Sequence, residues 1–343
     1  MNTTTTTPGS PGAAATAPRR RRNGIRRMLA LLIAVIAGVS LAACSGPAGA
    51  KSANVDTPRL KIAMVTSAAP GDTFWDIVRK GGDTAASKDN VELLYSSDPD
   101  GSRQAQLVQQ AVDQKVDGIV VALSKPDAVG GAVKEAVAAG IPVVSINAGE
   151  NQFADLGISA HFGQNETLAG ESAGKQLNEV GAKKVLCIVH EQGQIALEQR
   201  CEGVKSTFTG QVEQIYVNIA DMASSASTIT SKLQTTTDID YVMALAAPIA
   251  MSTLDSVQSA GSSAKVATFD MSADAITALQ DGRLAFIVDQ QPYLQGYLSV
   301  ENIWLQKTNG NTIGGGKPVY TGPNILTKDD ADAVAEFAKN GTR

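Results

Sequence analysis

Two similar stretches indicate the fold: Val116-Asp-Gly-Ile-Val-Val-Ala-Leu123 and Ile239-Asp-Tyr-Val-Met-Ala-Leu245. Both are short and almost wholly apolar, which is typical of strands buried on both faces of a parallel sheet. A helical pattern follows each stretch and ends at Gly140 or Gly261. A second apolar stretch then ends in Asn147 or Asp270. The same α/β unit therefore occurs twice, about 120 residues apart, too long a period for a solenoid repeat.

Short β-branched stretches alternate with helical patterns over the rest of the chain. The expected strands cover residues 60–66, 91–95, 118–123, 141–146, 184–189, 212–217, 241–245 and 266–269, and the expected helices cover 74–87, 102–114, 127–139, 195–208, 225–235 and 246–260. This order predicts an α/β protein with two doubly wound, Rossmann-like lobes and parallel sheets. The alternative is that the two halves resemble each other only because any two βαβ units look alike.

Asn147 and Asp270 lie at matched carboxyl ends of predicted strands, one in each half. Ligands of doubly wound sheets bind beyond these ends. If the two halves face each other, both side chains point into a shared cleft, which is the first predicted site.

Residues 1–43 have the pattern of a secretory signal peptide: six arginines, no acid, then an apolar stretch. Leu41-Ala-Ala-Cys44 resembles the bacterial lipobox, which implies a lipid on Cys44 and anchoring to the cell membrane. The alternative is an ordinary signal peptide or a short anchor helix that happens to end in cysteine. Residues 44–58 are small and polar, and we expect a flexible tether there.

Composition excludes several classes of function. The net charge is −5, and removing residues 1–43 with their six arginines makes it −11. Such an acidic chain is a poor candidate for binding nucleic acid through general electrostatics. Three cysteines and two histidines leave little for a metal site, so we expect neither metal nor cofactor.

From Arg59 to Leu326 the chain resembles type I periplasmic binding proteins of the ribose-binding branch, the sugar-capturing subunits of ABC importers. The resemblance rests on these motifs: Phe74-Trp75, Val116–Ser124 followed by Asp127, Asn165–Gly170, Arg200-Cys-Glu-Gly203, Phe269-Asp270, Asp281–Leu284 and Asp289–Pro292. It implies a monomeric binding protein, not an enzyme, that captures a monosaccharide or sugar alcohol outside the cytoplasm and docks on a permease.

The resemblance also implies a three-strand hinge, with crossovers near Gly163, Gln290 and Gly322. The expected amino-terminal lobe covers residues 59–163 plus 291–322. The expected carboxyl-terminal lobe covers residues 164–290 plus 323–343.

A sugar has apolar faces and hydroxyl-bearing edges, so its site needs aromatic rings and bidentate polar groups. By the resemblance, Phe74 and Trp75 stack on the sugar, although both could instead be core residues. Asp270 and Gln290 would bind hydroxyls, although a helix cap or a strand end could explain them. The candidate ligand-binding residues are Asp72, Phe74, Trp75, Ser124, Asn147, Gln164, Arg200, Met222, Asp270 and Gln290.

Arg200 has no carboxylate three or four residues away in its predicted helix, so no ion pair within that helix explains it. Its guanidinium fork suits two adjacent sugar oxygens, as the resemblance implies. The alternative is an arginine on the solvated surface.

The chain departs from the ribose-type pattern at Asn147-Ala148, at Ala246-Ala247 and at Met222, where the family has charged, polar or aromatic residues. The cleft should be roomier, and ribose itself becomes doubtful. Cys187 and Cys201 lie in a strand and in the next helix, and could be a disulfide or two buried thiols. His161 and His190 have no metal-ligand spacing, so we expect structural roles.

Other functions remain open at this point. The same fold could feed a sensor or bind a non-sugar solute. A lactose-repressor-type regulator needs a DNA-binding segment where this chain has a signal peptide. A Rossmann enzyme needs a Gly-x-Gly-x-x-Gly motif, which is missing after the strand at 60–66.

Overall fold

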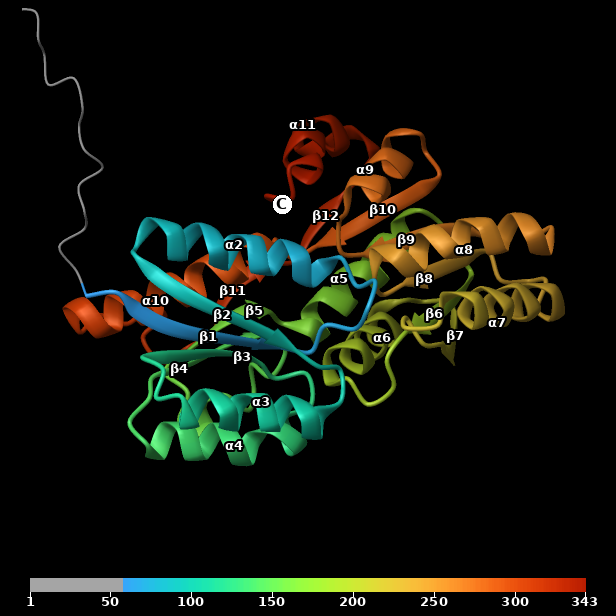
Figure 1. Ribbon diagram of the computed structural model, residues 1–343. Helices are drawn as coiled ribbons and strands as arrows, with labels where there is room; N and C mark the ends of the chain where they lie inside the picture. Colours follow the sequence, from blue (N-terminus) through green and yellow to red (C-terminus); the bar gives the residue numbers. More distant parts are fainter. Residues whose placement is uncertain (1–57) are drawn as a thin grey trace, which may run out of the picture. The chain divides into compact units, whose positions relative to one another are not determined.

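Two six-stranded sheets organise residues 58–343, the part of the chain that the computed structural model describes (Figure 1). The predicted signal peptide, the predicted lipidation site Cys44 and most of the predicted tether lie outside these residues. The strands of the first sheet, in the order β11-β5-β4-β3-β1-β2, are β1 (Leu60–Thr66), β2 (Val91–Ser97), β3 (Gly118–Ala122), β4 (Val143–Asn147), β5 (Ala160–Gln164) and β11 (Val319–Gly322). All its pairs are parallel.

The second sheet repeats this arrangement. Its strands, in the order β12-β10-β9-β8-β6-β7, are β6 (Lys184–Val189), β7 (Gln211–Tyr216), β8 (Tyr241–Ala244), β9 (Lys265–Phe269), β10 (Leu284–Asp289) and β12 (Asn324–Leu326). Only the pair of β10 and β12 is antiparallel among these described strands. The prediction of two doubly wound α/β lobes is confirmed.

Helices cover both faces of each sheet. The helices of the first lobe are α2 (Phe74–Lys88), α3 (Gly101–Asp113), α4 (Pro126–Ala138) and α10 (Pro292–Asn309). Figure 1 shows α3 and α4 side by side on the face of the sheet opposite α2. Strand β1 explains why both faces are covered: Ile62 and Met64 pack under α2, while Ala63 and Val65 pack under α3 and α4.

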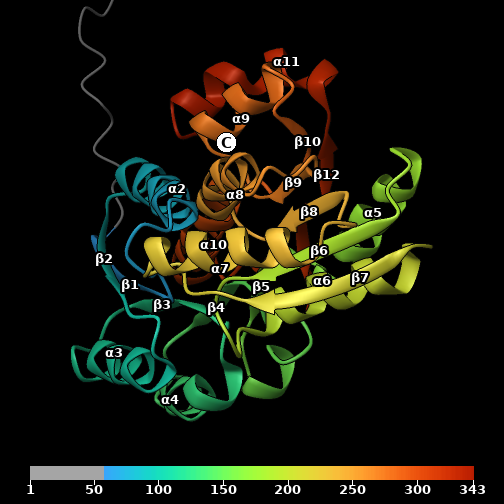
Figure 2. The ribbon, with the colours of Figure 1, turned by 90° about the vertical axis from the view of Figure 1, so that its right-hand side faces the viewer.

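The second lobe has the same layers. Its helices are α5 (Glu166–Glu179), α6 (Ile195–Thr207), α7 (Met222–Thr235), α8 (Ala247–Ala260), α9 (Ala273–Gln280) and α11 (Lys328–Lys339). Leu186 and Ile188 of β6 pack on the α7–α8 side, while Val185 and Val189 pack on the α5–α6 side. Figure 2 shows α9 and α11 next to each other, near β10 and β12.

Two of the expected elements begin more than one residue away from the expected start. Strand β4 begins at Val143 rather than Ile141, and Pro142 has no amide hydrogen to give to a ladder. Helix α7 begins at Met222 rather than Ser225, because the side chain of Asp221 caps it by accepting the amide of Ser224.

The chain passes between the sheets three times, after β5, after β10 and between β11 and β12. The first and second passages each lead directly into a helix, α5 and α10. Helix α10 packs against α2 in the first lobe, and α5 packs against α6 in the second. The pair of α2 and α10 and the pair of α6 and α5 occupy equivalent positions in the two halves.

The contact between α2 and α10 depends on glycine. A Cβ on Gly296 would overlap the carbonyl oxygen of Val78, and one on Gly81 would overlap that of Tyr293. We expect Gly296→Ala to push the helices apart and to lower the free energy of unfolding by about 1–3 kcal/mol. Denaturant unfolding measures this change. The matched control is Gly131→Ala in α4, where a Cβ meets nothing, and helix propensity alone should raise stability by up to about 1 kcal/mol. Equal effects of the two substitutions would contradict the packing argument.

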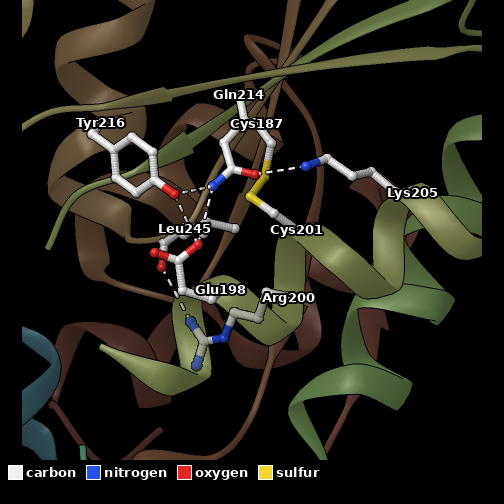
Figure 3. The surroundings of a disulfide bond; sticks show 8 residues. All are labelled: Cys187, Glu198, Arg200, Cys201, Lys205, Gln214, Tyr216 and Leu245. Atoms are coloured by element: carbon white, nitrogen blue, oxygen red, sulfur yellow. Dashed lines mark hydrogen bonds between the residues drawn. A yellow bond between two sulfur atoms is a disulfide. The ribbon is translucent and has the colours of Figure 1, made fainter. Parts of the chain in front are cut away.

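Cys187 and Cys201 form a disulfide between β6 and α6 (Figure 3), with their Cα atoms 6.1 Å apart. Of the two readings that the sequence left open, the structure has the bridge. Both cysteines are fully buried. Hydrogen bonds from Gln214 and Tyr216 to Glu198 also hold α6 against β7. Helix α6, which carries Arg200, is therefore held against two strands of its sheet, β6 through the disulfide and β7 through the hydrogen bonds.

Removing this disulfide should destabilise the protein. The two cysteines are 14 residues apart, and a loop of that length corresponds to about 3 kcal/mol in the chain-entropy account. We expect Cys187→Ala combined with Cys201→Ala to lower the free energy of unfolding by about 2–4 kcal/mol. Urea unfolding, with and without a reductant, tests this. A reductant should move the wild-type midpoint toward that of the double variant, and an unchanged wild-type midpoint would show that the bridge contributes nothing.

Candidate ligand-binding site

Asn147 and Asp270 occupy equivalent places in the two lobes. Asn147 ends β4, and Asp270 directly follows β9. Both have a backbone φ of 65°, in the left-handed region that asparagine and aspartate tolerate better than most residues. Both side chains line one cavity, so the predicted meeting of the two strand ends is observed.

Phe74 and Trp75 form the first turn of α2. Their rings are T-shaped, with centroids 5.0 Å apart and an interplanar angle of 88°. The backbone amide of Phe74 donates to Asp72 Oδ1 at 3.2 Å, which fixes the start of the helix. Both aromatics are buried, and both line the cavity while also packing on the core of the first lobe. The sequence left open whether these aromatics lie in the cleft or in the core. In the structure both line the cavity and also pack on the core.

One cavity gathers most of the predicted ligand-binding residues. Its lining consists of Asp72, Phe74, Trp75, Asn147, His190, Gln194, Leu197, Arg200, Ala246, Asp270 and Gln290. These residues come from both lobes and from the passage after β10. Seven of the ten candidates are among them.

Three candidates lie elsewhere. The hydroxyl of Ser124 is hydrogen-bonded to that of Ser67 at 2.8 Å, at the end of β3. Gln164 ends β5 and donates to Glu166 Oε2 at 2.8 Å. Met222 begins α7 and packs against the core of the second lobe. None of the three lines the cavity.

Arg200 is buried, with only 2% of its surface exposed, and not on the solvated surface. Its Nε donates to Glu166 Oε2 at 2.7 Å and its Nη2 donates to Glu166 Oε1 at 3.0 Å. Its Nη1 donates to the carbonyl oxygen of Leu245 at 3.1 Å and lies 3.5 Å from Asp270 Oδ2. Glu166 therefore occupies the edge of the guanidinium formed by Nε and Nη2, and the role of Arg200 in contacting a diol stays a prediction.

A chain of hydrogen bonds joins the lobes through the hinge. Gln290 Nε2 donates to Asp270 Oδ1, and Asn147 Nδ2 donates to Gln290 Oε1 at 3.3 Å. Gln295 Nε2 donates to the same Gln290 oxygen at 2.8 Å and to the hydroxyl of Thr321 at 3.2 Å. Gln290 thus links an acid of the second lobe to an amide of the first.

Burial in the cavity shifts the pKa values of its ionisable groups. Burial, helped by the nearby Asp270, raises the pKa of Asp72 to about 7. Burial raises the pKa of Asp270 to about 6, against the opposing attraction of Arg200. Burial and the charge of Arg200 lower the pKa of His190 to about 3, so this imidazole is neutral at physiological pH. Two carboxyl groups with raised pKa values and a neutral imidazole are thus part of the polar lining.

Four lining residues were not among the candidates: His190, Gln194, Leu197 and Ala246. His190 directly follows β6, so the strand-end rule that selected Asn147 and Asp270 would also have selected it. Ala246 follows the end of β8 by two residues and is the N-cap of α8, and Gln194 is the N-cap of α6. Glu166, the partner of Arg200, follows β5 by two residues. It lies in the motif Asn165–Gly170, but the sequence alone did not indicate that it pairs with Arg200.

Within residues 58–343, no group of three or more histidine, cysteine or acidic side chains is arranged to hold a metal ion. In the same part of the chain, no helix is both long and apolar enough to span a bilayer.

Two α/β lobes with one shared cavity at their strand ends define a two-lobed protein that binds a small molecule. A profile described as the periplasmic binding protein domain matches residues 62–311, and the chain belongs to this family. Membership implies a location outside the cytoplasm.

Solved and curated relatives agree with this assignment. A carbohydrate transporter from Acidothermus cellulolyticus 11B, crystallised with myo-inositol, is 51% identical with a TM-score of 0.82, and the match covers 83% of this chain and 100% of that one. The ribose import binding protein of Bacillus subtilis is 27% identical over 76% of this chain and 87% of its own. A solute-binding protein of an ABC transporter from Agrobacterium vitis, with bound D-fucose, is 27% identical with a TM-score of 0.73, over 81% of this chain and 99% of its own. These relatives are binding proteins, which supports the expectation that this chain is not an enzyme.

Proposed function

We propose that this chain is the substrate-binding protein of an ABC importer and that it captures a cyclitol of the myo-inositol type. A monosaccharide or linear sugar alcohol of similar size is the wider class. The observation that carries the proposal is the 51% identity, across the whole length of that chain, to a carbohydrate transporter crystallised with myo-inositol.

The chemistry of the cavity supports a neutral polyol. Phe74 and Trp75 supply apolar ring surface for C–H groups. Asp72, Asp270 and the side-chain amides of Asn147 and Gln290 supply hydrogen-bond partners for hydroxyls. An anion would meet two carboxylates, while the single lining arginine is already paired with Glu166.

The arrangement of the hinge supports capture by closure. We propose that the lobes comprise residues 59–163 plus 291–322 and residues 164–290 plus 323–343. Ligand bound between them favours the closed form, because it contacts both lobes only there. The closed form then docks on a permease.

We also propose that Cys44 carries a lipid that anchors the protein to the cell membrane, since Leu41-Ala-Ala-Cys44 follows an apolar stretch as in a lipobox. Cys44→Ala should move the protein from the membrane fraction to the soluble secreted fraction. Equal membrane association of both proteins would refute the anchor and leave the binding function intact.

The binding function is tested by thermal unfolding of the purified full chain against a panel of cyclitols, pentoses, hexoses and linear polyols. A ligand at a thousand times its Kd should stabilise the folded state by about 4 kcal/mol, which is a shift of several degrees. We expect myo-inositol to give the largest shift. A shift from another stereochemical group would correct the ligand class, and no shift from any member, with the protein shown to be folded, would overturn the proposal.

A further inference from the structure

The charges of the cavity do not balance. Among its lining residues, the side chains that can carry a charge near neutral pH are Asp72, Asp270 and Arg200, because His190 is neutral there. Glu166, itself only 2% exposed, binds Arg200 through both carboxylate oxygens, at 2.7 and 3.0 Å. The positive charge of Arg200 is thus already matched before either lining carboxylate is considered.

The two lining carboxylates differ in how they are held. Asp270 accepts a hydrogen bond from Gln290 and lies 3.5 Å from Arg200 Nη1. Among the described residues, the side chain of Asp72 accepts a single hydrogen bond, from the backbone amide of Phe74. Asp72 is therefore the lining acid whose charge has no cation of its own.

The other charged groups around Asp72 do not change this balance. The charged groups that act on it most are Asp270, Glu191 and Arg200. A neighbouring pocket that Asp72 also lines contains Asp76, Asp98 and Arg103, and there Arg103 is paired with Asp98 at 2.8 Å. Glu191 is paired with Lys125 at 2.7 Å, and His190 is neutral. Burial and the repulsion from Asp270 raise the pKa of Asp72 to about 7, which is the response of a carboxylate that lacks a cation.

The surroundings of Asp72 suit a cation. Phe74 and Trp75 lie two and three residues further along the chain, and their rings line the same cavity. Aromatic faces attract ammonium groups, and a carboxylate next to them adds a charge-assisted hydrogen bond. The same carboxylate repels an anionic substituent.

We propose that Asp72 sets the charge of the ligand that the cavity accepts, so that a polyol with one protonated amine in place of a hydroxyl binds more tightly than the neutral polyol. This inference rests on the proposed function, because it concerns the same site. Aminocyclitols and amino sugars are then a second ligand class of the cavity, and the negative charge of Asp72 disfavours phosphorylated and carboxylated analogues.

Isothermal titration of the full chain tests the inference with myo-inositol and a panel of monoamino-monodeoxy inositols, each with one hydroxyl replaced by an amine. At about pH 7.5 Asp72 is mostly ionised and the amines are mostly protonated. We expect the best amine to bind about tenfold more tightly than myo-inositol, because a charge-assisted hydrogen bond replaces a neutral one. At about pH 5.5 this ratio should fall as Asp72 takes up a proton.

Two variants separate charge from structure. Asp72→Asn should abolish the preference for the amine. Asp76→Asn removes an exposed acid in the first turn of α2 that does not line this cavity, and it should retain the preference. If myo-inositol binds and every amine binds more weakly, or if D72N keeps the preference, the inference is wrong and the proposed function stands. If neither myo-inositol nor any amine binds the folded protein, both are overturned.

Discussion

Replacing Arg200 with alanine is expected to lower the free energy of unfolding by about 3–5 kcal/mol. Arg200 and Glu166 are each 2% exposed and are joined by two hydrogen bonds. The substitution leaves the Glu166 carboxylate buried without its cation, and that desolvated charge is the source of the loss. Urea unfolding at neutral pH measures the effect.

A double variant shows whether the unpaired charge is the cause. Arg200→Met combined with Glu166→Met removes both charges and keeps apolar volume, so it should be more stable than Arg200→Ala alone by about 2 kcal/mol or more. The matched surface control is Arg103→Ala, which breaks the ion pair with Asp98 at a side chain that is 64% exposed and should cost less than about 1 kcal/mol. A double variant no more stable than Arg200→Ala would mean that the loss comes from packing.

Asp270→Asn is expected to stabilise the ligand-free protein at neutral pH. Burial raises the pKa of Asp270 from its ordinary 3.8 to about 6, so the ionised form is unfavourable in the folded state. The contribution of the protonated Asp270 to the stability of the wild type is therefore fully present below pH 3.8 and is lost as the pH rises through about 6. A shift of about two pKa units corresponds to about 3 kcal/mol. The asparagine variant has no such proton to lose, so its advantage should grow over this window and stay constant above it.

Unfolding at a series of pH values, without ligand, tests this expectation. The control is Asp274→Asn, which removes an equal charge at an exposed position nearby in α9 and should follow the wild type. A difference between Asp270→Asn and the wild type that is independent of pH, or that shrinks as the pH rises, would contradict it.

The same substitution should weaken ligand binding. A hydrogen bond to a charged acceptor contributes about 1.5–3 kcal/mol, so affinity for the polyol should fall roughly 10- to 150-fold at neutral pH. Asp270 then destabilises the ligand-free protein but strengthens ligand binding, a trade-off that is common at functional sites. Titration calorimetry measures this loss, and an unchanged affinity would remove Asp270 from the proposed set of ligand contacts.

Much of the fold could be predicted because its signals are local. The stretches 118–123 and 241–245 contain no charged side chain that would have to face water, which predicts strands buried on both faces of a sheet. Strand β1 has the predicted ends, and α2 differs by one residue. The two largest errors in where an expected element begins, at β4 and α7, lie where a proline or a capping aspartate decides the boundary.

The site was predictable only in part. Asn147 and Asp270 followed from the rule that ligands bind at strand ends, and their partners in the cavity followed from the resemblance to a known family. His190 was interpreted as structural because it has no metal-ligand spacing, although it follows a strand as they do. Ser124, Gln164 and Met222 carry plausible side chains, but these contact protein groups outside the cavity.

The sequence by itself determined two α/β halves, the strand ends that carry Asn147 and Asp270, and the aromatic pair that opens the first helix, because each depends on neighbours along the chain. Only the tertiary structure decided what Arg200 does. Its partner Glu166 is 34 residues away on another helix, and the pairing exists because α5 packs against α6. The charge of the cavity, and hence the unmatched Asp72, depends on that packing, because electrostatic balance is a property of distances in space and not of positions in sequence.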